Sequence, residues 1–134
     1  MEKKFVLYRI YYGEKLISYV GQTTQELQNR MYQHFFKDVD LDIRSLKKID
    51  FAYCKSQADL NVYEMYYINK IHPFENRLGV SKDSLSIELP ELEFENFDIS
   101  ILEKYKKSDT IILNRSTKVP KNNLEFYQKR IDDL

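Results

Sequence analysis

Two stretches near the start of the chain, residues 5–12 and 16–21, are rich in β-branched and aromatic side chains and flank a short polar break. This pattern predicts a β-hairpin. A two-residue loop at positions 13–14, with glycine first as in a type II′ turn, would pair Tyr8 with Tyr19. Both tyrosines would then lie on one face of the sheet, with Cβ atoms about 4.5 to 5.5 Å apart. The same register pairs Tyr12 with Lys15 and Ile10 with Ile17.

A helix is predicted directly after the hairpin. Thr23 and Glu26 have the spacing of a capping box, with Thr23 as the N-cap, so the helix should run from about residue 24 to residue 36. Residues four apart along it form the stripe expected to be buried: Leu27, Met31 and Phe35.

A third strand and a second helix follow. Residues 49–54 predict the strand, and Ser56 with Asp59 three positions later predicts a helix start. Pro73 should end this helix at about His72, which we expect to interact with the last helical carbonyls. The order β-β-α-β-α predicts an α+β fold, in which helices flank a small antiparallel sheet of about three strands.

The pattern loosens after residue 79, which predicts a first domain over residues 1–81 and a C-terminal extension over residues 82–134. The extension begins with an acidic segment that also contains aromatic side chains. It continues with a short helix near residues 99–107, an apolar stretch at 111–113 and an amphipathic helix over 122–131. We expect it to dock on the first domain or to form an interface.

Composition and charge change this picture only locally. The chain has 134 residues, 43% of them hydrophobic, which suits one compact domain with an appendage. Basic and acidic residues number 21 each, so the chain lacks the positive bias typical of a dedicated DNA-binding protein. Residues 83–103, however, contain acidic side chains and neither lysine nor arginine. This segment should avoid a phosphate backbone, and it could instead bind a protein partner or a second copy of the chain.

The sequence contains no apolar run long enough to span a membrane and no charged-then-apolar leader. Cys54 is the only cysteine, so no internal disulfide can form. We therefore expect a protein of the reducing cytoplasm without a membrane partner.

A constellation of polar residues carries the functional prediction. Val6-Leu7-Tyr8 lies on the first strand and Tyr19-Val20-Gly21 on the second, and four further residues follow in order: Arg30, His34, Glu64 and Asn76, the last in a Pro-x-x-Asn element. In this order and spacing the chain resembles the GIY-YIG nuclease family over roughly residues 5–78. One departure is that Val6 stands where the family's first triplet has glycine. We expect altered strand packing there and retained chemistry.

The resemblance implies an endonuclease that hydrolyses DNA phosphodiester bonds with Mg²⁺ or Mn²⁺ and no organic cofactor. It implies that Glu64 holds the metal, Tyr8 accepts a proton from water and Arg30 stabilises the charge of the transition state. Tyr19 and His34 would orient water or assist proton transfer, and Asn76 would fix the local geometry. A tyrosine with an ordinary pKa of about 10 is a poor base at neutral pH, so the metal and Arg30 must favour its deprotonation.

The residues also have an interpretation of their own. Arg30 and His34 are four apart on the first helix and should project from one face, at the rim of a cleft. Taken alone, this pair could be a solvated arginine and a boundary histidine. Glu64 falls on the buried face of the second helix, where a carboxylate needs a cation, a hydrogen-bond donor or protonation. Without the other motifs, Glu64 could equally reach the edge of that face or pair with a lysine.

One alternative can be dismissed from the sequence, and two stay open. A zinc site is dismissed, because one cysteine and two histidines lack any zinc-site spacing. A non-catalytic protein of the same fold could act as an inhibitor or an interaction module, which Val6 and the acidic segment favour. RNA is not excluded as the substrate.

Overall fold

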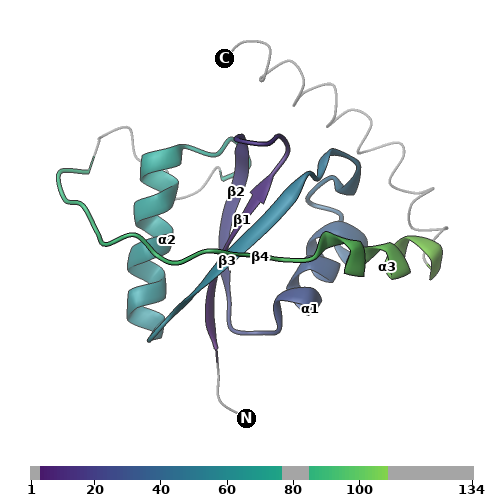
Figure 1. The fold of residues 1–134 in the computed structure, drawn as a ribbon, viewed down its shortest axis with the longest axis horizontal. Helices are drawn as coiled ribbons and strands as arrows, with labels where there is room; N and C mark the ends of the chain where they lie inside the picture. Colours follow the sequence, from purple (N-terminus) through teal and green to yellow (C-terminus); the bar gives the residue numbers. More distant parts are fainter. Residues whose placement is uncertain (1–3, 77–84, 109–134) are drawn as a thin grey trace. The chain divides into compact units, whose positions relative to one another are not determined.

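The computed structural model describes residues 4–76 and 85–108, which form two compact units (Figure 1). The first unit comprises residues 4–27, 46–76 and 85–98, and the second comprises residues 28–45 and 99–108. The apolar stretch predicted at 111–113 and the helix predicted over 122–131 lie outside the described residues.

The first unit is built on an antiparallel sheet of four strands. These are β1 (Phe5–Tyr11), β2 (Ile17–Thr23), β3 (Lys48–Cys54) and β4 (Glu95–Asn96), in the order β2-β1-β3-β4. The α+β class and the antiparallel sheet are confirmed, but the predicted count of three strands is wrong. β4 comes from the acidic segment and pairs with Asp50 and Phe51 of β3.

The predicted hairpin forms, but its predicted register is wrong. Tyr8 lies opposite Gly21, and Tyr19 lies opposite Ile10. The pairing shifts at a bulge between Ile10 and Tyr11, and the connection is closed by a hydrogen bond from the Tyr12 N–H to the Leu16 carbonyl, 3.1 Å long. The loop is therefore longer than two residues, and the extra length moves β2 by two positions relative to β1.

Helix α2 (Gln57–Ile71) lies along one face of this sheet (Figure 1). Ser56 caps it as predicted, because its side chain accepts a hydrogen bond from the Asp59 N–H. The helix ends before His72, which adopts the left-handed conformation with φ of 55°, and Pro73 follows. Its buried side chains Leu60, Tyr67 and Ile68 form a core cluster with the strand residues Leu7 and Val20. Three partly buried side chains of the acidic segment pack against this cluster: Leu89, Leu92 and Phe94.

The second unit contains α1 (Leu27–Tyr32) from its second residue onward, a π-helix (Gln33–Lys37), a 3₁₀ turn (Ile43–Ser45), a second 3₁₀ turn (Ile99–Leu102) and α3 (Glu103–Ser108). The short helix predicted near residues 99–107 is present. Tyr105 packs against Tyr32 and Phe36, with ring centroids 4.7 and 5.6 Å apart, and its hydroxyl accepts a hydrogen bond from the Gln28 amide.

The predicted start of the first helix is wrong. Thr23 belongs to β2, where it pairs with Val6, and its hydroxyl accepts a hydrogen bond from the Gln25 N–H two positions later. Thr23, the predicted N-cap, is therefore part of a strand, and the helix begins four residues later at Leu27. Within residues 4–76 and 85–108, no helix is long and apolar enough to cross a membrane.

Candidate functional site

Tyr8 and Tyr19 lie on the same face of the sheet and pack against each other. Their ring centroids are 6.0 Å apart, with an angle of 32° between the ring planes. Tyr8 has no exposed surface, whereas Tyr19 is half-buried. The two are diagonal neighbours, because Tyr19 is two residues from Gly21, the partner of Tyr8.

The rings of Tyr8 and Tyr19 pack directly over the backbone of Gly21. A Cβ atom placed on this residue would lie 2.6 Å from both Cζ and Oη of Tyr8, and 2.7 Å from Cε2 of Tyr19. A Cβ atom does not approach a non-bonded atom this closely, so any side chain at position 21 would displace the phenol groups. The glycine of the second triplet is therefore required by the packing of the two tyrosines.

Asn76 holds the strand segment between Tyr19 and Gly21. Its Oδ1 accepts a hydrogen bond from the Val20 N–H, and its Nδ2 donates to the Val20 carbonyl, both 2.8 Å long. Because β2 is an edge strand, these bonds satisfy backbone groups that no neighbouring strand reaches. The Glu75 N–H adds a bond of 3.0 Å to the Ser18 carbonyl. The loop after α2 thus fixes the edge of β2.

Val6, the first residue of the first triplet, is an ordinary residue of β1. It is buried, with 3% of its surface exposed, and pairs with Thr23 on one side and Tyr53 on the other. Its side chain occupies the face that carries Tyr8.

Glu64 lies on α2 and is half-buried. Its Oε1 accepts a hydrogen bond of 3.0 Å from the side-chain amide of Gln22, the residue that follows the second triplet. The carboxylate thus has an amide donor as its partner, and the lysine that the sequence left open as an alternative partner is not found among the described residues.

The first unit does not bring Glu64 and the tyrosines together on one face. Side chains alternate along a strand, and Gln22 lies opposite Leu7, which packs with α2. Tyr8 follows Leu7, and its partner Gly21 precedes Gln22, so the Tyr8 side chain projects from the other face of the sheet. The sequence indicates the spacing of these residues along the chain and does not indicate which face of the sheet each strand residue takes.

Arg30 and His34 belong to the second unit. The Arg30 guanidinium donates a hydrogen bond of 3.0 Å to the Gln33 amide oxygen. His34 is only 1% exposed, so its predicted place at the rim of a cleft is wrong. Its Nδ1 lies 3.1 and 3.2 Å from the carboxylate oxygens of Asp40, and since a carboxylate can only accept, Nδ1 carries the proton of this contact.

His34 lies in a segment where the helix type changes. α1 ends at Tyr32, and the chain continues as a π-helix from Gln33 to Lys37. The wider turn alters the angular spacing that an α-helix would give to residues 30 and 34. Neither the π-helix nor the contact between His34 and Asp40 could be predicted from the sequence pattern.

Only Glu64, among the predicted residues, is a candidate metal ligand. No group of three or more histidine, cysteine or acidic side chains that could hold a metal ion occurs within residues 4–76 and 85–108. A single carboxylate still fits Mg²⁺, which keeps several waters and often binds through one or two carboxylates and substrate phosphate.

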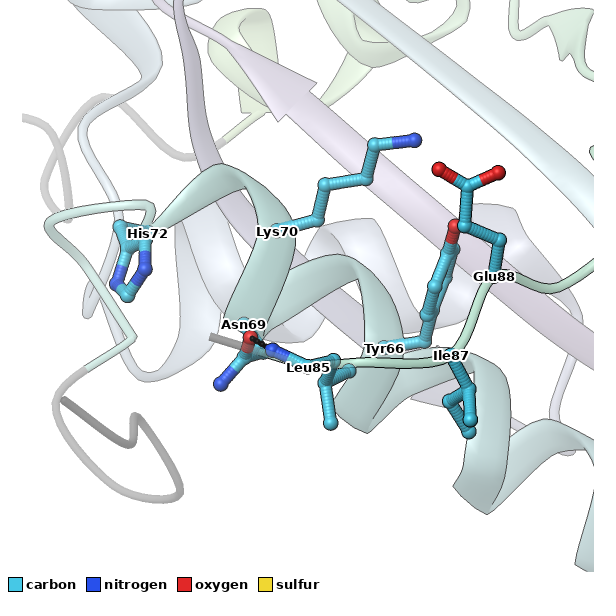
Figure 2. Close-up of a pocket in the computed structure, with 7 residues that line it drawn as sticks. All are labelled: Tyr66, Asn69, Lys70, His72, Leu85, Ile87 and Glu88. Carbon is cyan, nitrogen blue, oxygen red and sulfur yellow. Dashed lines mark hydrogen bonds between the residues drawn. The ribbon is translucent and has the colours of Figure 1, made fainter. Parts of the chain in front are cut away.

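A pocket of about 380 Å³ lies at the C-terminal half of α2, and none of the predicted catalytic residues lines it (Figure 2). Residues of α2 and of the following acidic segment line it: Tyr66, Asn69, Lys70, His72, Leu85, Ile87 and Glu88. Asn69 accepts a hydrogen bond of 3.2 Å from the Leu85 N–H across it. Lys70 and Glu88 point in one direction in Figure 2, and Leu85 and Ile87 point away from them.

Comparison with known proteins finds no matching family, no matching curated protein and no matching solved structure.

Proposed function

We propose that the chain is a metal-dependent endonuclease of the GIY-YIG type that hydrolyses DNA phosphodiester bonds. The observation that carries the proposal is the mutual contact of motif residues from three separate segments. Tyr8 and Tyr19 rest on Gly21, and Asn76 holds the backbone of Val20 between them. The motif residues therefore meet at residues 19–21 of the edge strand, which supports the proposal.

Glu64 is the residue that would hold the divalent cation. It is half-buried, its carboxylate accepts one amide hydrogen bond, and an oxygen ligand of this kind suits Mg²⁺ or Mn²⁺. When bound, the cation would supply charge stabilisation at the scissile phosphate and its leaving oxygen.

The remaining roles follow from the chemistry of each side chain. The Tyr8 phenolate would accept the proton of the attacking water, and Tyr19 would orient that water. The Arg30 guanidinium would stabilise the added negative charge on the phosphoryl oxygens. His34 Nδ1, already held by Asp40, would keep the ring oriented for proton transfer.

The opposite placement of the tyrosines and Glu64 restricts where the phosphate can bind. Gln22, the partner of Glu64, projects from the α2 face, and Tyr8 and Tyr19 project from the other. A phosphate that contacts both sets must therefore lie at the edge of β2, beyond the part covered by residues 75–76.

The test is cleavage of supercoiled plasmid, linear duplex and single-stranded DNA by the full-length protein with Mg²⁺, Mn²⁺ or EDTA. Wild-type protein should cut in a metal-dependent manner. Glu64→Gln, which keeps the shape and removes the charge, should not cut, although it should unfold at the wild-type temperature. Unimpaired cutting by Glu64→Gln would reject the metal assignment.

The burial of two proposed catalytic groups favours a second candidate, a non-catalytic protein that binds another macromolecule through the same fold. Tyr8 is 0% exposed and His34 is 1% exposed, so neither side chain presents itself to a substrate in this conformation. The same assay performed with RNA of matched sequence separates the candidates. Cleavage of RNA alone would change the substrate class, and cleavage of neither nucleic acid would favour the binding protein.

A further inference from the structure

A network of side-chain amides runs from α2 to β2 and ends at Glu64. The Gln57 Nε2 donates to Gln22 Oε1 at 2.6 Å, and Gln22 Nε2 donates to Glu64 Oε1 at 3.0 Å. Asn61 Oδ1 accepts from both glutamines, at 2.9 Å each. Gln57, Asn61 and Glu64 are spaced by four and three residues on α2, so they form one stripe facing the strand residue Gln22.

The direction of every bond in this network is set by the carboxylate. Because Glu64 can only accept, the atom of Gln22 that faces it must be Nε2. Gln22 Oε1 then faces Gln57, whose amide must present its nitrogen. The network therefore delivers one oriented donor to one oxygen of Glu64. No further hydrogen bond to this carboxylate occurs among the described residues, which leaves Oε2 as the oxygen available to a ligand.

We infer that Gln22 is a positioning residue that holds the Glu64 carboxylate in the orientation in which it binds a divalent cation. This inference rests on the proposed nuclease function. A glutamate side chain rotates about three bonds, and a donor fixed to Oε1 removes much of that freedom before the metal arrives. Hydrogen bonds to metal-binding carboxylates are known to affect affinity, and the loss of such a partner lowers it about 10- to 100-fold.

Gln57 provides a matched control within the same network. It donates to Gln22 and Asn61 but has no bond to Glu64. Gln22→Leu removes the donor to Glu64 at nearly constant side-chain size, whereas Gln57→Leu removes an equivalent amide one step further away. A general disturbance of the α2 surface would affect both variants equally.

The experiment measures Mn²⁺ affinity of the full-length protein by electron paramagnetic resonance, together with the metal concentration that gives half-maximal DNA cleavage. Gln22→Leu should weaken Mn²⁺ binding at least about tenfold and raise the half-maximal metal concentration, while its rate at saturating metal stays close to wild type. Gln57→Leu should change both values far less. An unchanged Mn²⁺ affinity of folded Gln22→Leu would overturn the inference.

Two further variants separate this inference from the proposed function. If wild-type protein cuts DNA and Glu64→Gln neither binds Mn²⁺ nor cuts, an unaltered Gln22→Leu rejects only the role of Gln22. If wild-type protein neither binds Mn²⁺ nor cuts, the proposed function fails and the inference fails with it. Should Gln22→Leu not fold, Gln22→Asn serves instead, because it keeps the amide and withdraws the donor by one methylene. It carries the same expected loss of affinity.

Discussion

At position 21 the side chain is limited to hydrogen because two phenol rings occupy the space above the backbone. Gly21→Ala would place a methyl group 2.6 Å from the Tyr8 ring, so Tyr8 or the strand must move. We expect the free energy of unfolding to fall by about 1 to 3 kcal/mol, as for other overpacked cores. Urea denaturation measures it.

Gly13→Ala is the matched control, since its new Cβ would meet only the Leu16 Cβ at an ordinary distance of 3.4 Å. It should change stability by no more than about 0.5 kcal/mol. Equal stability of the Gly21→Ala variant and wild type would contradict the packing described for Tyr8 and Tyr19.

Tyr8→Phe deletes only the hydroxyl group that we assign as the proton acceptor. The rate of DNA cleavage should fall by at least about a hundredfold, the usual contribution of a general base, while the variant stays folded. Tyr53→Phe is the control, because Tyr53 projects from the same face of the sheet and is 52% exposed. A Tyr8→Phe rate within a few-fold of wild type would assign the base to another group, such as His34.

At the scale of elements, periodicity predicted which segments form strands and helices but not how they align. The two tyrosines share a face, as the pattern indicated, because the observed register differs from the predicted one by two positions, and a shift by an even number of residues leaves each side chain on the same face. The register itself depends on loop geometry, and a bulge at Ile10 and Tyr11 shifts it. β4 was missed because Glu95 and Asn96 are both exposed and too few to show alternation.

The loop after α2 can be tested through Asn76, which contacts both backbone groups of Val20. Asn76→Asp replaces the donor Nδ2 by an oxygen that faces the Val20 carbonyl oxygen. We expect the free energy of unfolding to fall by about 1 to 3 kcal/mol, because a hydrogen bond is exchanged for a repulsive contact. Amide hydrogen exchange at Val20 should become faster.

Asn29→Asp makes the same chemical change at an exposed position of α1 and should leave stability and exchange at Val20 unaltered. If Asn76→Asp matched this control, the loop would not be what holds the edge of β2. Cleavage activity, measured in parallel, would show whether that edge matters for the proposed chemistry.

At the scale of the whole molecule, the residues of the candidate site stay a prediction from the sequence, and their arrangement in the structure differs from the predicted one. Asn76 was expected to fix local geometry, and it bonds to the backbone beside both tyrosines. The placement of Glu64 and Tyr8 on opposite faces depends on the register of the β1–β2 hairpin and on the side-chain contact between Gln22 and Glu64, which are 42 residues apart in the chain. No local pattern carries that information.

A partly buried ion pair that the sequence did not indicate joins β1 to β3 and contacts the acidic segment through Phe94. Arg9 of β1 lies opposite Asp50 of β3 and donates two hydrogen bonds to it, 2.8 and 2.7 Å long. The Arg9 guanidinium carbon lies 3.4 Å from the centroid of the Phe94 ring. Burial alone would lower the pKa of Arg9, but the hydrogen bonds and charge of Asp50 offset this and raise it. Arg9 therefore stays charged at any pH at which the protein is studied.

Two buried tyrosines beside this ion pair make the first unit sensitive to alkaline pH. Tyr11 donates a hydrogen bond of 2.9 Å to Asp50, and Tyr67 of α2 packs against Phe94, with ring centroids 5.6 Å apart. Burial, which disfavours the charged phenolate, is the largest cause that raises the pKa of Tyr11 and of Tyr67, each to about 12. In the unfolded chain both should titrate at about 10.

The sign of the effect follows from the raised values. The folded state binds the phenolic protons more tightly than the unfolded state, so the stability they contribute is fully present below about pH 10 and is lost as pH rises to about 12. Urea denaturation at several pH values should show the free energy of unfolding falling over this window, with tyrosinate absorbance following global unfolding. Tyr11→Phe and Tyr67→Phe should each flatten the profile, since each removes one of the linked protons. Titration of both tyrosines near pH 10 in protein that remains folded would contradict their burial against the Arg9 and Asp50 pair.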